Sequence, residues 1–108
     1  MEKKTAEQIL STPDFKTSEV EVPQWNAVVK VRSLSVKGRV AVGQGSLKDK
    51  KVDEAMFNVL TLVHGCVDPR FMEDHVQRML DKDAVAVDML AARIWELSRP
   101  DAETIKNV

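Results

Sequence analysis

The sequence predicts a mainly α (α+β) fold: a small helical domain of three to four helices with a short N-terminal β-hairpin. Three observations support this fold class. Apolar residues recur at three- and four-residue steps in residues 52–67 and again in residues 84–97, which is the spacing of one face of an α-helix. Between residues 19 and 34, apolar and polar residues alternate instead, which is typical of half-buried strands.

Near the N-terminus, a short helix is predicted within residues 4–11. Thr5 and Gln8 have the spacing of a capping box, in which each side chain binds the backbone N–H of the other residue. Pro13 ends this helix, because a residue that precedes proline disfavours the α conformation. The apolar face would consist of Ala6, Ile9 and Leu10.

A β-hairpin is predicted next. Residues 19–22 and 27–34 alternate as strands do, and residues 23–26 form the turn between them. Two strands alone are marginally stable in water, so the hairpin is expected to lie on the helices. Trp25, at the turn, is the expected anchor, because a tryptophan ring buries a large apolar area.

Residues 35–50 allow two interpretations. Residues 39–42 alternate weakly and would form a third strand, whereas Ser35 is also a suitable N-cap for a helix that begins directly after it. Both interpretations are weakened by glycines, which lie at positions 38, 43 and 45. The sequence therefore leaves the structure of this segment open.

The central helix is predicted for residues 52–67. Its apolar stripe consists of Val52, Met56, Val59, Leu60, Val63 and Val67. Phe57 and Leu62 lie off this stripe, so the helix is apolar almost all round. Such a helix is either central to its own core or covered by a second chain.

Two further helices are predicted after the central one. Asp68 is the expected cap of a helix over residues 70–80, with Pro69 at its first position. Asp83 is the expected cap of the last helix, residues 84–97. The core face of this last helix would consist of Val87, Leu90, Ala91, Ile94 and Leu97, with Trp95 at its edge.

The length of 108 residues predicts one domain, which is large enough to bury a core without disulfides. The predicted organisation of this single domain, residues 1–108, is an N-terminal arm or short helix (1–18), a β-hairpin (19–34), a helical core (50–98) and a polar tail (99–108).

Composition excludes several classes of protein. Apolar residues make up 44% of the chain and charged residues 31%, which indicates a globular protein rather than a disordered one. The net charge is −1 and neither half is strongly basic, so nucleic-acid binding is not expected. Apolar runs are too short for a membrane span, and no signal-peptide core follows Met1. A single cysteine, Cys66, suits a reducing cytosol.

No residue pattern indicates catalysis, a metal site or a cofactor. His64, Cys66 and His75 lack the spacing of a zinc site. His64 and Cys66 are two residues apart, so on a helix they do not face each other as a nucleophile pair would. We therefore expect a protein that is not an enzyme and needs no cofactor.

Apolar residues that the predicted core does not use are candidates for partner binding. On the last helix, three residues lie opposite the core face among charged neighbours, and two on the central helix lie off its stripe. Single exposed apolar residues are normal on protein surfaces, so this assignment competes with ordinary exposure. The candidate contact residues are Val85, Met89, Ala92, Phe57 and Leu62.

Several short motifs occur together in a recognisable order. They are a Val-Pro-x-Trp segment at residues 22–25, a Val-x-Val-Arg-x-Leu strand at residues 29–34, a Val-Asp-Pro-Arg-Phe segment at residues 67–71, and a Leu-x-x-x-Ile-x-x-Leu-Ser pattern at residues 90–98. In this order and spacing, over about residues 20–98, the chain resembles the tail assembly chaperones of long-tailed (siphovirus-type) bacteriophages and prophages. It departs from the pattern at Gly38, where many relatives are acidic, and at residues 26–27, where relatives often have glycine.

The resemblance implies a specific role. Such chaperones are non-enzymatic proteins of the host cytoplasm that bind the tape measure protein, help recruit tail tube subunits and are absent from the mature virion. Self-association is also expected, because the central helix has few polar positions. The alternative is a small structural tail or head-completion protein, which would remain in the particle.

Overall fold

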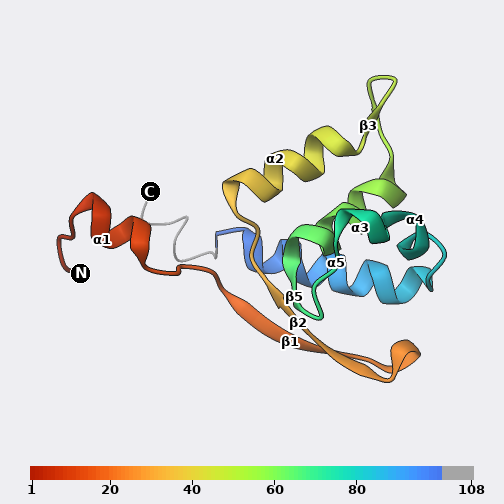
Figure 1. Ribbon diagram of the computed structural model, residues 1–108, viewed down its shortest axis with the longest axis horizontal. Coiled ribbons are helices and arrows are strands. Elements are labelled where there is room, and N and C mark those ends of the chain that lie inside the picture. The colour runs from red at the N-terminus through yellow and green to blue at the C-terminus, as the bar shows by residue number, and fades with distance from the viewer. Residues whose placement is uncertain (101–108) are drawn as a thin grey trace.

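The computed structural model describes residues 1–100 and shows a mixed α+β fold with five α-helices and a small antiparallel sheet (Figure 1). In chain order the elements are α1 (Ala6–Ser11), β1 (Thr17–Val22), the 3₁₀ helix η1 (Pro23–Trp25), β2 (Ala27–Arg32), α2 (Val36–Gly45), β3 (Leu47–Lys48), β4 (Lys51–Val52), α3 (Glu54–Gly65), β5 (Cys66–Asp68), the 3₁₀ helix η2 (Glu73–His75), α4 (Val76–Met79) and α5 (Ala84–Ser98). Most of the predicted polar tail, residues 101–108, lies outside the described residues.

The predicted hairpin is confirmed. β1 and β2 pair antiparallel, with Val20 opposite Val29, and η1 makes the turn. Asn26 ends that turn in the left-handed conformation, which asparagine tolerates better than most residues. Val29 and Val31 alternate with exposed residues and are fully buried, so this face of β2 lies on the core, as the alternation predicts.

A third strand joins the sheet where the sequence predicts part of a helix. β5 pairs antiparallel with the free edge of β2, with Cys66 opposite Val31, giving the order β1-β2-β5. The prediction that Asp68 caps a helix over residues 70–80 is therefore wrong. Because β5 satisfies backbone groups along β2, the chain leaves the sheet extended, and helical structure begins only with η2 and α4.

The segment after the hairpin is a helix, so the third-strand interpretation of residues 39–42 is wrong. Ser35 caps α2: its side-chain oxygen accepts a hydrogen bond from the backbone N–H of Gly38 at 2.9 Å. A Cβ added at Gly38 would lie 3.3 Å from Cβ of His64, so the glycine permits the close approach of α2 and α3. The charged segment that follows forms a two-stranded ribbon, with Leu47 opposite Val52.

The central helix is shorter than predicted, because Val52 lies in β4 and Val67 in β5. Asp53 caps α3 by accepting a hydrogen bond from the backbone N–H of Met56. The buried face also differs from the predicted stripe: the buried residues of α3 are Val59, Thr61, Leu62 and Gly65. The buried face of α3 differs from the predicted stripe because α3 packs against two helices, α2 and α5.

The last helix agrees with its prediction. The Asp83 side chain accepts a hydrogen bond from the backbone N–H of Ala86 and so caps α5. The residues that α5 buries are Ala86, Val87, Leu90, Ala91 and Ile94. Leu97 packs against this core while partly exposed. α5 contacts α3 and also the strands β1 and β2, so it packs between α3 and the sheet (Figure 1).

The end of α5 is tied to the start of α2 through Ser98. The backbone N–H of Leu34 donates to Oγ of Ser98 at 2.8 Å, and this hydroxyl donates to the carbonyl of Ile94 at 2.6 Å. The Arg39 guanidinium donates to the Ser98 carbonyl at 2.6 Å. Residues that lie 64 and 59 positions apart in the chain are therefore joined at this point.

The N-terminal helix forms with the predicted capping box of Thr5 and Gln8. No residue of α1 is buried, and the helix stands apart from the rest of the protein at one end (Figure 1). Ile9 and Leu10 are 58% and 81% exposed, so the apolar face predicted for this helix has no partner within the described chain.

Candidate partner-binding surfaces

The outer face of α5 presents two of its three predicted contact residues. Val85 is 64% exposed and Ala92 is exposed, whereas Met89 is partly buried and packs against the core. α5 repeats every 3.6 residues, so side chains three and four positions apart lie on one face. Val85, Met89 and Ala92 accordingly form one stripe, with Met89 set deeper than the other two.

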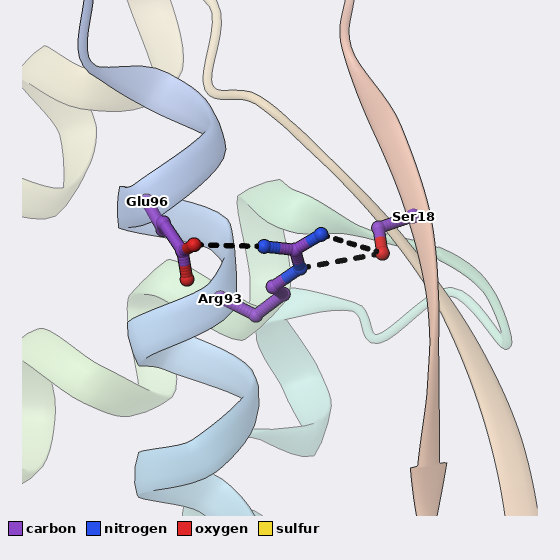
Figure 2. Close-up of polar contacts among 3 residues, drawn as sticks. All are labelled: Ser18, Arg93 and Glu96. Atoms are coloured by element: carbon purple, nitrogen blue, oxygen red, sulfur yellow. Dashed lines mark hydrogen bonds and ion pairs between the residues drawn. The ribbon is translucent and has the colours of Figure 1, made fainter. Parts of the chain in front are cut away.

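A polar cluster borders this stripe at Arg93 (Figure 2). The guanidinium lies between Glu96 on α5, with Nη1 3.0 Å from the carboxylate, and Ser18 on β1, whose hydroxyl accepts from Nε and Nη2 at 3.3 and 3.2 Å. Such a partly exposed ion pair contributes only ~0–1 kcal/mol to stability. Its consequence is geometric: the contact ties the start of β1 to the second half of α5.

Leu62 and Phe57 are not placed as the contact prediction requires. Leu62 is fully buried in the core. Phe57 is partly buried and stacks on Trp95, with ring centroids 5.4 Å apart and planes 12° apart. The indole N–H of Trp95 donates to the hydroxyl of Thr61 at 3.0 Å, which fixes the pair on α3. Phe57 therefore joins α3 to α5, and Leu62 belongs to the core.

Two further pairs of exposed apolar residues lie on α2 and on the ribbon that follows it. Val36 and Val40 are 85% and 50% exposed and lie one helical turn apart. Leu47 and Val52 are 56% and 57% exposed and face each other across β3 and β4. We call these four residues the α2 patch. In the sequence, the Val-x-x-x-Val spacing after Ser35 could have indicated that Val36 and Val40 share a face. That spacing is informative only once the segment is known to be a helix.

A hollow of about 530 Å³ opens between η1 and the segment from Pro69 to α4. Its apolar lining consists of Trp25, Pro69, Phe71, Met79 and Val87. Trp25 and Phe71 meet edge to face, with centroids 6.2 Å apart, and the Lys82 ammonium lies 5.8 Å from the Trp25 ring centroid. Trp25 thus joins the hairpin to the helical layer, as predicted, but its ring is only partly buried.

Two of the residues that were considered for metal binding or catalysis, Cys66 and His75, take part in the core and in the start of a 3₁₀ helix. Cys66 is buried, which raises the pKa of its thiol to about 12, so the reactive thiolate is scarce near neutral pH. The Nδ1 atom of His75 accepts a hydrogen bond from the backbone N–H of Met72 at 3.0 Å and so supports the start of η2. Within residues 1–100 no group of three metal-ligating side chains occurs. No helix in that range is both long and apolar enough to cross a bilayer.

Comparison with known proteins finds a solved structure with a similar fold. No protein-family model matches the sequence, and no curated protein matches it either. Among solved structures, the chain is similar to the tail assembly chaperone of bacteriophage HK97, with a TM-score of 0.62 and 17% sequence identity. The alignment covers 88% of this chain and 94% of the other. At this identity the similarity concerns the fold alone, and it extends over nearly the whole of both chains.

Proposed function

We propose that this protein is a non-enzymatic tail assembly chaperone of a long-tailed bacteriophage or prophage. In this role it binds the tape measure protein in the host cytoplasm, helps recruit tail tube subunits, and is absent from the mature virion. The observation that carries the proposal is the similarity to the HK97 tail assembly chaperone over 88% of this chain. The sequence motifs between residues 20 and 98 point independently to the same class of protein.

Two features of the surface support a binding role. Val85 and Ala92 on α5, beside the partly buried Met89, offer an apolar stripe of the kind that accepts one face of an amphipathic helix. Methionine adapts its shape easily, which suits a protein that must accept many local sequences along one long partner. The net charge of −1 provides little long-range steering, so this contact is expected to be apolar.

Self-association is the second part of the proposal. The α2 patch leaves four large apolar side chains in solvent, and a second copy would cover them. This assignment replaces the predicted one on the central helix, because α2 and α5 already cover α3. Sedimentation at high micromolar concentration tests it: oligomers are expected, and a strictly monomeric protein would contradict this part of the proposal.

Co-expression with the tape measure protein of the same phage tests the main proposal. The tape measure protein is expected to be soluble and to co-purify with this chain in high salt. Val85→Asp is the best variant, because Val85 is well exposed and Met89 packs partly in the core. We expect Val85→Asp to lose the tape measure protein. Val28→Asp, which places the same charge on the exposed side of β2 outside both the α5 stripe and the α2 patch, is the matched control and should retain it.

Two results would contradict the proposal. A complex that dissociates between low and moderate salt, while Val85→Asp still binds, would show that the contact is electrostatic and lies elsewhere. Mass spectrometry of purified particles gives the second test. A stoichiometric amount of this chain in mature virions would favour the alternative, a small structural tail or head-completion protein.

A further inference from the structure

The hollow beside Trp25 differs from the other candidate surfaces in its concave shape, its aromatic lining and its positive charge. Its volume of about 530 Å³ lies within the range of small-ligand pockets, roughly 300–1,000 Å³. A space of this size accommodates one or two large side chains but not a whole helix. Trp25 and Phe71 on its wall are residues of the type that dominate binding energy at protein interfaces.

Positive charge surrounds this apolar lining. Arg70, Arg78 and Lys82 all line the hollow, and no carboxylate is found among the lining residues in the described part of the chain. Within residues 1–100, none of these three cations lies within 4 Å of a carboxylate. An acidic partner can therefore pair with them without first displacing an internal ion pair, and arginine binds a carboxylate through two parallel hydrogen bonds.

The Trp25 ring supplies a second indication. Its Nε1 is buried and has no hydrogen-bond acceptor among the described residues. A buried donor without an acceptor destabilises a folded protein, and a small movement of the ring toward a bound carbonyl or carboxylate would remove this penalty. The other tryptophan, Trp95, already donates to Thr61, so the two indoles differ in what a ligand can offer them.

Acidic residues limit what can occupy the hollow. Glu73 and Asp74 start η2, and Asp81 precedes Lys82; all three are exposed and lie within two positions of a lining residue in the sequence. A long polyanion such as single-stranded nucleic acid would be repelled by these carboxylates as it left the basic rim. A short peptide that carries one or two carboxylates avoids them.

We propose that this hollow binds a short acidic peptide segment of a partner protein, with an apolar or aromatic side chain seated against Trp25 and Phe71 and flanking carboxylates paired with Arg78 and Lys82. The proposal concerns a different surface from the α5 stripe and does not depend on the tail assembly role. It also predicts a different response to salt, because binding here combines charge with apolar contact.

The test uses the full chain labelled with ¹⁵N and a dye-labelled, amidated hexapeptide that has one aspartate on each side of a central leucine–phenylalanine pair and a glycine at each end. Added peptide is expected to shift the indole N–H signal of Trp25 and to leave that of Trp95 in place. Two control peptides isolate the two contributions: one has asparagine in place of the aspartates, and the other has serine in place of leucine and phenylalanine. Each is expected to bind at least about tenfold more weakly.

Charge reversal on the protein completes the test. Lys82→Glu and Arg78→Glu should each raise the Kd for the hexapeptide about tenfold, whereas Lys37→Glu, on exposed α2, should leave it unchanged. An unshifted Trp95 signal shows that each variant is folded. Equal binding by Lys82→Glu and Lys37→Glu would overturn the proposal. So would a dye-labelled oligothymidine that shifts Trp25 when the hexapeptide does not.

Discussion

Helices α5 and α2 both have apolar residues on more than one side, but only α5 has its main apolar face covered within the chain. α5 buries five residues between α3 and the sheet, including Leu90 and Ile94, which are fully inaccessible. α2 buries only Gly38 and Val42 and leaves Val36 and Val40 in solvent. The difference indicates that α5 supports the fold, whereas the outer face of α2 is available for contacts outside this chain.

Replacing Ile94 with alanine should have the largest effect on stability. Ile94 is fully buried at the contact of α5 with α3, and truncating such a side chain typically destabilises a protein by about 2–5 kcal/mol. Urea unfolding followed by circular dichroism measures the change. A loss below about 1 kcal/mol would mean that α5 is not the main support, and the contrast with α2 would fail.

The thiol of Cys66 reports whether the β5 side of the core stays closed. Burial raises its pKa from 9.0 to about 12, so the thiolate fraction at pH 8 is roughly a thousandfold lower than in an unfolded chain. Labelling with a thiol reagent should be slower in the native protein than in urea by about that factor. Because the native pKa is the higher one, this contribution to stability is complete below pH 9 and is lost as pH rises toward 12. Equal labelling rates would show that this side opens readily.

Gly65→Ala tests how tightly α3 and α5 pack. A Cβ at Gly65 would lie 2.6 Å from both Cδ1 and Cγ2 of Ile94, which is too close for undistorted packing. Overpacking of this kind should destabilise the protein by about 1–3 kcal/mol. Combining it with Ile94→Ala should remove most of the clash, so the two losses should not add. Additive losses would place the strain somewhere other than this contact.

Val40→Asp should have the smallest effect on stability. Val40 is half exposed on α2, and surface substitutions away from buried features usually change the free energy of unfolding by less than ~0.5 kcal/mol. The same variant should weaken self-association, because it places a charge within the α2 patch. Sedimentation measures the change in self-association, and urea unfolding of the same sample measures the change in the free energy of unfolding. A large loss of stability with unchanged oligomers would show that α2 belongs to the closed part of the molecule.

Local signals in the sequence predicted much of the fold. Asp83 followed by a regular apolar stripe identified α5, and the capping box of Thr5 and Gln8 identified α1, because both signals involve only near neighbours. β5 was missed, since its pairing of Cys66 with Val31 depends on a strand 35 positions earlier in the chain. No pattern within residues 66–68 records that partner.

The contact surfaces were harder to predict than the core. Leu62 was assigned to a partner because it lies off the predicted stripe of α3, yet it is fully buried. A stripe identifies one covered face, but α3 has neighbours on two sides, and the second neighbour is α2, whose structure the sequence left open. The hollow was missed for a similar reason: Trp25 and Lys82 are distant in sequence and meet only in the fold.

The hydrogen bonds at Ser98 have a consequence for when the chain can fold during its synthesis. Leu34 leaves the ribosome 64 residues before its partner Ser98, an interval of roughly 3–13 s at about 5–20 residues per second. During that time the buried faces of β2 and α3 have been synthesised but α5 has not. The nascent chain therefore cannot complete its core until α5 emerges.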